Sequence, residues 1–173
     1  MYVLAAAVYE APEQERARAA MLELRGARRI RKSHWHEMDE QERARAVRSV
    51  VGLGGSHVVV VGSPVPCRRQ ERARAKCLER LVFELHGLGV TALVMEGRSI
   101  QLNGRDVHTI TGARHNLPKA TEFHVSHVLG KDEPLFWVAD IVAGAVRAAT
   151  FGQGHYHAEL APQIFQFMVS TGC

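Results

Sequence analysis

Apolar runs typical of buried strands alternate along this chain with longer stretches of helical periodicity. We expect strands at residues 1–9, 57–61, 91–96 and 123–128, an exposed strand or edge at 28–37, and helices at 11–25, 39–53, 66–88 and 134–151. Residues 97–121 predict a turn with a short helix, and 156–170 a partly apolar helix or tail. This alternation indicates an α/β or mixed α+β fold in which helices flank a central sheet and functional groups gather at strand ends.

The length of the chain predicts one domain, residues 1–173, large enough to bury a sizeable core. Residues 135–151 approach the length and apolarity of a membrane span, but Asp140 and Arg147 inside this segment argue against one. No basic, apolar leader precedes the first expected strand. We therefore expect a soluble, cytoplasmic protein that is not embedded in a membrane.

The charge balance permits nucleic acid as a partner. The formal net charge is +4, and most of the basic residues are arginines, whose planar guanidinium groups suit phosphates. The sextet Gln-Glu-Arg-Ala-Arg-Ala occurs at 14–19, 41–46 and 70–75, each time near the start of an expected helix. Two interpretations stay open for these copies: helix-forming composition on a solvated face, or a basic surface.

One carboxylate interrupts the apolar helix expected at 134–151. Pro134 suits its first turn and Asp132 can cap it. Asp140, Gly144 and Arg147 fall on one stripe of this helix. Because an ionised carboxylate is costly to bury alone, Asp140 should meet a cation, hydrogen-bond donors or water.

Three carboxylates could converge at the end of the expected sheet: Glu96 at a strand end, Asp106 ten residues later, and Asp140. Clustered carboxylates repel one another unless a cation lies between them, and such oxygen ligands suit Mg²⁺ or Mn²⁺. Each residue also has a simpler interpretation. Glu96 can pair with Arg98, Asp106 can cap a helix, and Asp140 can pair with Arg147.

Three segments resemble the second half of a large family catalogued as domain of unknown function 3800 and regarded as ribonuclease H-like. They are Val-Met-Glu-Gly-Arg at 94–98, Leu-Asn-Gly-Arg-Asp at 102–106 and Phe-Trp-Val-Ala-Asp-Ile-Val-Ala-Gly-Ala-Val at 136–146. The resemblance implies a ribonuclease H-like sheet and a divalent-metal-dependent nuclease, with Glu96, Asp106 and Asp140 as catalytic residues and as ligands of Mg²⁺ or Mn²⁺. Members of the family usually open with an Asp-Glu-Ser-Gly strand, to which nothing here corresponds.

Because the strand with the family's first acidic residue has no counterpart, the alternative to a nuclease is a catalytically inactive protein that binds nucleic acid or assembles with itself. Six residues could contact DNA or RNA, by charge or by stacking: Arg29, Arg31, Trp35, Arg98, Arg105 and Arg147. An exposed basic edge explains the first three equally well. The apolar segment 160–170 could form a homodimer.

Overall fold

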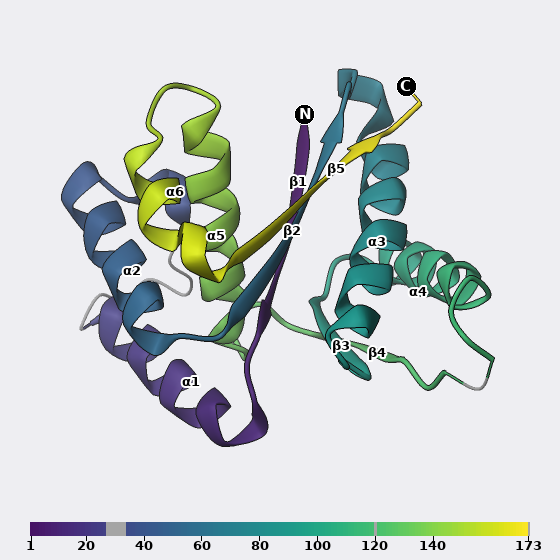
Figure 1. The fold of residues 1–173 in the computed structure, drawn as a ribbon, viewed down its shortest axis with the longest axis horizontal. Coiled ribbons are helices and arrows are strands. Elements are labelled where there is room, and N and C mark those ends of the chain that lie inside the picture. The colour runs from purple at the N-terminus through teal and green to yellow at the C-terminus, as the bar shows by residue number, and fades with distance from the viewer. Residues whose placement is uncertain (27–33, 120, 173) are drawn as a thin grey trace. The chain divides into compact units, whose positions relative to one another are not determined.

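The structure is a computed structural model that describes residues 1–26, 34–119 and 121–172. The described residues have a mixed α+β fold (Figure 1), which confirms the expected class. The elements in chain order are β1 (Tyr2–Val8), α1 (Ala11–Arg25), η1 (Trp35–Glu37), α2 (Glu40–Leu53), β2 (Ser56–Ser63), η2 (Cys67–Arg69), α3 (Gln70–Gly87), β3 (Ala92–Glu96), α4 (Ile100–Arg114), β4 (His124–Val128), α5 (Leu135–Ala149), α6 (His155–Leu160), η3 (Ala161–Gln163) and β5 (Ile164–Ser170). The η elements are short 3-10 turns.

The described strands form two sheets. β1, β2 and β5 form a three-stranded sheet in the order β1-β2-β5, and β3 and β4 form a two-stranded sheet. β3 and β4 are parallel, in a register that pairs Ala92 with His124 and Glu96 with Val128.

The chain divides into two compact units. One, the α3–α4 unit, comprises Met1–Leu4, Val60–Leu129 and Gln166–Cys173. The other, the α5 unit, comprises Ala5–Val59 and Gly130–Phe165.

In the α5 unit, helices α1, α2 and α6 all pack against α5. Trp137, Ile141 and Ala145 of α5 are buried, which explains why this helix is so apolar. Burial of a large apolar side chain contributes roughly 1.5–3 kcal/mol. The helix starts at Leu135, whose amide donates to Glu133 Oε1 at 3.0 Å. The N-cap position is Pro134, so the expectation that Asp132 caps this helix was wrong.

In the α3–α4 unit, α3 packs on α4, and β3 and β4 pair beside them. Leu78 and Leu85 of α3 and Ile110 of α4 are buried, so the apolar faces of the two helices form the core of this unit.

Three expectations for local structure were wrong. Residues 97–121 contain the 15-residue helix α4, capped by Ser99, rather than a short helix. Residues 164–170 form strand β5, with only the six-residue α6 and a 3-10 turn before it. β3 was expected to be an interior strand, yet among its residues only Met95 is buried. Of the strand expected at 28–37, residues 28–33 lie outside the described residues, and residues 35–37 form the 3-10 turn η1.

Within the described ranges, we find no helix that combines the length and apolarity needed to cross a membrane.

Candidate functional site

Asp106 lies buried on α4, between two arginines. Its two carboxylate oxygens accept hydrogen bonds from Nε and Nη2 of Arg74, each 2.9 Å long. Arg98 Nη2 donates a third bond, also 2.9 Å, to Oδ1. Arg74 belongs to α3 and Arg98 follows β3. The carboxylate therefore joins α3, α4 and the end of β3, and it is not a helix cap.

Further polar groups surround this ion cluster. Arg74 Nη1 donates to the Tyr2 hydroxyl at 3.1 Å, and Arg98 Nη1 donates to Glu71 at 2.7 Å. His127 Nε2 lies 3.8 Å from Asp106 Oδ2. Burial by itself would raise the pKa of the Asp106 carboxyl, but the hydrogen bonds and charges of the two arginines outweigh it and hold the pKa below its ordinary value.

These contacts decide how well Asp106 suits a metal ion. A divalent cation at its oxygens would have to displace two guanidinium groups and would be repelled by their charges. In the described geometry, Asp106 therefore does not fit the role of a Mg²⁺ or Mn²⁺ ligand.

Glu96 is the last residue of β3, and its side chain is exposed. The amide of the next residue, Gly97, donates to the Val128 carbonyl at 2.8 Å and continues the ladder with β4. Arg98, the salt-bridge partner that sequence suggested for Glu96, donates to Glu71 and Asp106.

Asp140 binds a segment 105 positions away in the chain. Its Oδ2 accepts a hydrogen bond from the Trp35 amide at 2.8 Å and lies 3.8 Å from His34 Nδ1. The expectation that this carboxylate meets a hydrogen-bond donor is therefore confirmed, although the donor is a backbone amide.

Gly144, on the same stripe of α5, lies directly beneath the Trp35 indole. A Cβ atom at Gly144 would overlap Trp35 Cγ. The indole also meets the Tyr156 ring edge-on at 5.1 Å, and the Arg43 guanidinium lies 5.2 Å from its centroid. Asp140 and Gly144 thus hold the turn η1 on α5, and this packing accounts for the indole without a nucleic acid.

The three predicted ligands do not share a unit. Glu96 and Asp106 belong to the α3–α4 unit, and Asp140 belongs to the α5 unit. Among the described residues, no group of three or more His, Cys, Asp or Glu side chains is placed to hold a metal ion.

The predicted nucleic-acid contacts have different surroundings. Arg29 and Arg31 lie outside the described residues. Arg98 is engaged with Glu71 and Asp106, whereas Arg105 on α4 and Arg147 on α5 are exposed.

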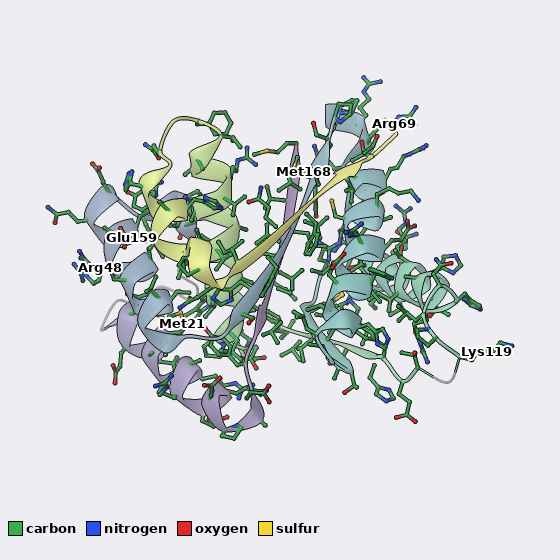
Figure 2. All side chains as sticks on the ribbon, viewed as in Figure 1. Met21, Arg48, Arg69, Lys119, Glu159 and Met168 are labelled. Atoms are coloured by element: carbon green, nitrogen blue, oxygen red, sulfur yellow. The ribbon has the colours of Figure 1, made fainter. Side chains whose placement is uncertain are left out.

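A cationic face on α3, which we did not single out from the sequence, stands out in the structure. It consists of the exposed residues Arg72, Lys76 and Arg80 of α3 together with the exposed Arg68 and Arg69 of the preceding turn η2. Positions 72, 76 and 80 follow one another at i, i+4 and i+8, so their side chains share one side of the helix. Arg69 projects from the start of α3 (Figure 2). The sequence does contain a signal for this cationic face, because the third copy of the repeated sextet, at 70–75, lies in this stretch.

An aromatic ring interrupts this cationic face. Phe83 is 54% exposed, and its position, i+11 from Arg72, places it on the same side of α3. The Arg80 guanidinium lies 5.9 Å from the centroid of Phe83 and 4.9 Å from that of Phe167 on β5. Arg80 is therefore held beside two rings, in the range of cation–π contacts.

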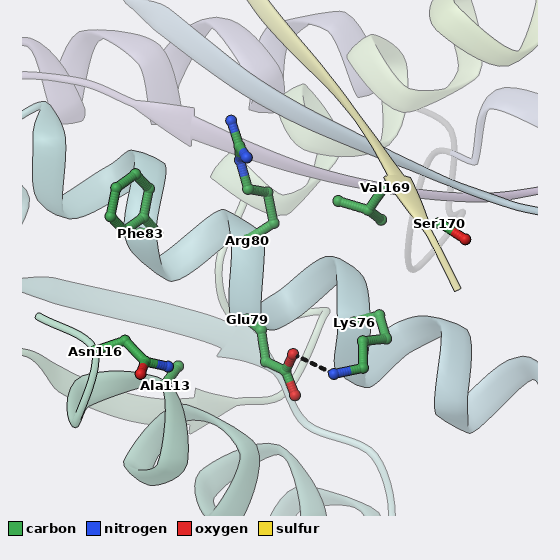
Figure 3. Close-up of a pocket in the computed structure, with 8 residues that line it drawn as sticks. All are labelled: Lys76, Glu79, Arg80, Phe83, Ala113, Asn116, Val169 and Ser170. Carbon is green, nitrogen blue, oxygen red and sulfur yellow. Dashed lines mark hydrogen bonds and ion pairs between the residues drawn. The ribbon is translucent and has the colours of Figure 1, made fainter. Parts of the chain in front are cut away.

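A hollow of about 390 Å³ opens at this place, between α3, the end of α4 and the end of β5 (Figure 3). Its lining includes Lys76, Glu79, Arg80, Phe83, Asn116 and Ser170. Lys76 Nζ forms an ion pair with Glu79 at 2.7 Å. The lining therefore contains one acidic residue, which is paired, and the two cations Lys76 and Arg80. All these residues belong to the α3–α4 unit.

In comparisons with known proteins, no family model matches the sequence, and neither the curated proteins nor the solved structures give a significant match.

Proposed function

We propose that this protein binds nucleic acid through the cationic face of α3. The observation that supports this proposal most directly is the series of exposed cations Arg72, Lys76 and Arg80 on one side of α3, the side that also carries the exposed ring of Phe83. Phosphates are held by such charges, and an interleaved aromatic ring can stack on a base. A cytoplasmic location, where nucleic acid is accessible, belongs to the same proposal.

Local ion pairs do not neutralise this face. Lys76 pairs with Glu79 and Arg80 with Glu84, but all four side chains are at least partly in contact with solvent. Exposed pairs of this kind contribute only about 0–1 kcal/mol, so phosphates can compete for the cations. Among the described residues, Arg68, Arg69 and Arg72 form no ion pair with a carboxylate.

The test compares two variants with equal loss of charge. Arg72→Gln/Lys76→Gln removes two cations from the α3 face, and Arg45→Gln/Arg48→Gln removes two exposed cations from α2. Fluorescence anisotropy with a labelled 20-nucleotide probe should show an affinity loss of about tenfold or more for the first variant only. Equal losses in both variants would mean that binding follows net charge and not this face.

A metal-dependent nuclease with a ribonuclease H-like fold is the second candidate. It is favoured by Glu96, which is exposed at the end of a strand, as the resemblance implies. The resemblance assigns this candidate Mg²⁺ or Mn²⁺ held by Glu96, Asp106 and Asp140, so it requires that Asp106 first release Arg74 and Arg98. A phosphodiesterase assay with either ion should then show activity that Asp140→Asn abolishes, and equal activity in both proteins would exclude this candidate.

Self-association through residues 160–170 remains a further proposal. Phe165 and Met168 in this segment are 46% and 63% exposed. If they form a homodimer, light scattering should show a dimer that Phe165→Ser dissociates.

A further inference from the structure

We propose that the hollow beside Phe83 receives an unpaired base, so that single-stranded nucleic acid is the preferred ligand. This inference rests on the proposed function and specifies its substrate class. It concerns only the α3–α4 unit, to which every lining residue belongs.

The hollow offers both contacts that a base needs. Its volume, about 390 Å³, lies within the range of roughly 300–1,000 Å³ typical of sites for small ligands. Phe83 supplies an exposed aromatic ring, and Asn116, also exposed, supplies an amide that can donate and accept hydrogen bonds. Figure 3 shows these two side chains on different elements around the same opening.

The charges beside the hollow suit the backbone of the same strand. Arg72 and Lys76 precede Phe83 on its side of α3, and Arg72 lies about 12 Å from Arg80 along the axis at ~1.5 Å per residue. A strand that runs along the helix can therefore place phosphates against Arg72 and Lys76 and a base against Phe83. The Arg72 guanidinium is kept in place by a hydrogen bond from its Nε to the Thr171 carbonyl, 3.2 Å long.

The aromatic contact distinguishes single strands from duplexes. In a duplex each base is stacked on its neighbours and exposes only its edges in the grooves, so its ring face is not available to a side chain. An unpaired base exposes that face. Stacking on one aromatic side chain is sequence-tolerant and is lost on truncation to alanine with an affinity decrease of about tenfold.

Glu79, the acidic residue in the lining, provides a second, independent test of this proposal. Glu79 lies in the lining and pairs with Lys76. Removal of its charge frees Lys76 and lowers the repulsion of phosphates. Glu79→Gln should therefore bind single strands more tightly, whereas a protein partner that uses this acid would be bound more weakly.

The experiment measures anisotropy with a labelled 20-nucleotide single strand and with its duplex, for wild type, Phe83→Ala and Phe83→Tyr. We expect tighter binding of the single strand, a loss of about tenfold for Phe83→Ala on that probe alone, and recovery in Phe83→Tyr. A 2-aminopurine base in the probe should be quenched by wild type and less so by Phe83→Ala. Because Phe83 is exposed, circular dichroism should show all three proteins equally folded.

Two outcomes separate this inference from the proposed function. If single strand and duplex bind equally, or Phe83→Ala binds the single strand like wild type, the base site is wrong while binding by the cationic face stands. If neither probe binds at low salt, the proposed function itself is wrong.

Discussion

Asp140 shows how a carboxylate on an apolar helix can find its hydrogen-bond donor in a distant segment of the backbone. The sequence predicted that this lone carboxylate meets a cation, hydrogen-bond donors or water. Its donor is the Trp35 amide, and Gly144 one turn later leaves room for the Trp35 ring. Spacing along α5 predicted that Asp140 and Gly144 share a face, but it could not identify a partner 105 positions away.

The close approach of Trp35 to α5 leads to the first prediction. In Gly144→Ala the new methyl group overlaps the indole, so the turn η1 must shift, at a cost of about 1–3 kcal/mol in unfolding free energy. Gly112→Ala on α4 is the matched control, because nothing lies within 4 Å of the added atom. It should stabilise the protein by about 0.5–1 kcal/mol. Urea denaturation of both variants checks the opposite signs, and equal effects would contradict the packing.

Asp106 leads to a second prediction, since it neutralises two arginines inside the protein. Asp106→Asn leaves Arg74 and Arg98 without their shared carboxylate, and breaking such a buried pair costs about 3–5 kcal/mol. The control, Glu79→Gln, removes the acid of an exposed pair and should change stability by less than about 1 kcal/mol. Thermal and urea unfolding give both values. If Asp106→Asn changes stability only slightly, the ion cluster is not what holds this carboxylate in the fold, and the result would favour a role of Asp106 in the nuclease candidate.

The pH dependence at Asp106 follows from its lowered pKa. The folded chain keeps this carboxylate ionised to lower pH than the unfolded chain, whose aspartates titrate near pH 4. Its contribution to stability is therefore complete above about pH 4 and is lost as the pH falls below that value.

His57 provides a third prediction, in a different pH range. Burial lowers the pKa of His57 to about 4, and nearby Gln163 offsets only part of this effect. The Gln163 amide donates instead to the Val51 carbonyl at 2.9 Å, and neither ring nitrogen of His57 has a hydrogen-bond partner among the described residues. The unfolded chain takes up a proton at this histidine near pH 6.5, the folded chain only near pH 4. The folded state should thus lose stability as the pH falls between these values.

Because one pKa unit corresponds to about 1.4 kcal/mol, this loss should reach roughly 3 kcal/mol by pH 4. The measurement is urea denaturation at pH 7, 6, 5 and 4.5. His57→Phe removes the titrating group and should flatten the curve over this range, whereas an unchanged slope in the variant would assign the effect to other groups.

At the scale of elements, the start of α2 shows that a local sequence signal can fix where a helix begins. The helix expected at 39–53 begins beside Asp39, which forms a capping box in which its carboxylate accepts from the Glu42 amide at 2.8 Å. Asp39→Ala should lower the unfolding free energy by about 0.5–2 kcal/mol. Gln41→Ala, an exposed change in the same first turn, should alter it by less than about 0.5 kcal/mol. Equal losses in both variants would contradict a specific cap.

Helices and strands with strong local signals were predicted well, and those that depend on distant partners were not. α1 begins at Ala11 and ends at Arg25, the bounds that were expected for it. β5 was missed because Ile164–Ser170 alternates poorly, and its pairing with β2 is a long-range contact. α4 was underestimated because Gly104 and Gly112 disfavour a helix locally, whereas buried Ile110 and Asp106 hold it in place.

The same limit applies to the candidate sites. Sequence could place Glu96, Asp106 and Asp140 on their elements. It could not show that Arg74 and Arg98 donate hydrogen bonds to both carboxylate oxygens of Asp106. The α3 face was within reach of sequence analysis, since positions 72, 76 and 80 share one side of any helix. What the sequence lacked was the hollow, which β5 and the end of α4 complete.

At the scale of the whole molecule, the proposal assigns the attraction of nucleic acid to the cationic face of α3 and not to the net charge of +4 as such. Charge spread evenly over the surface would attract nucleic acid weakly and would make every surface arginine equivalent. A cationic face of five side chains on η2 and α3 concentrates the attraction at one place. Binding should therefore depend strongly on salt and on the few residues of this face.

The most direct test of that claim is the salt dependence of the affinity for a single strand, measured by anisotropy between 50 and 200 mM NaCl. A plot of log K against log salt should be linear, and its slope should be shallower by about 1.4 in Arg72→Gln/Lys76→Gln, since each phosphate contact on a single strand contributes about 0.7. Arg45→Gln/Arg48→Gln should keep the wild-type slope. Identical slopes and affinities in all three proteins would contradict binding through the α3 face.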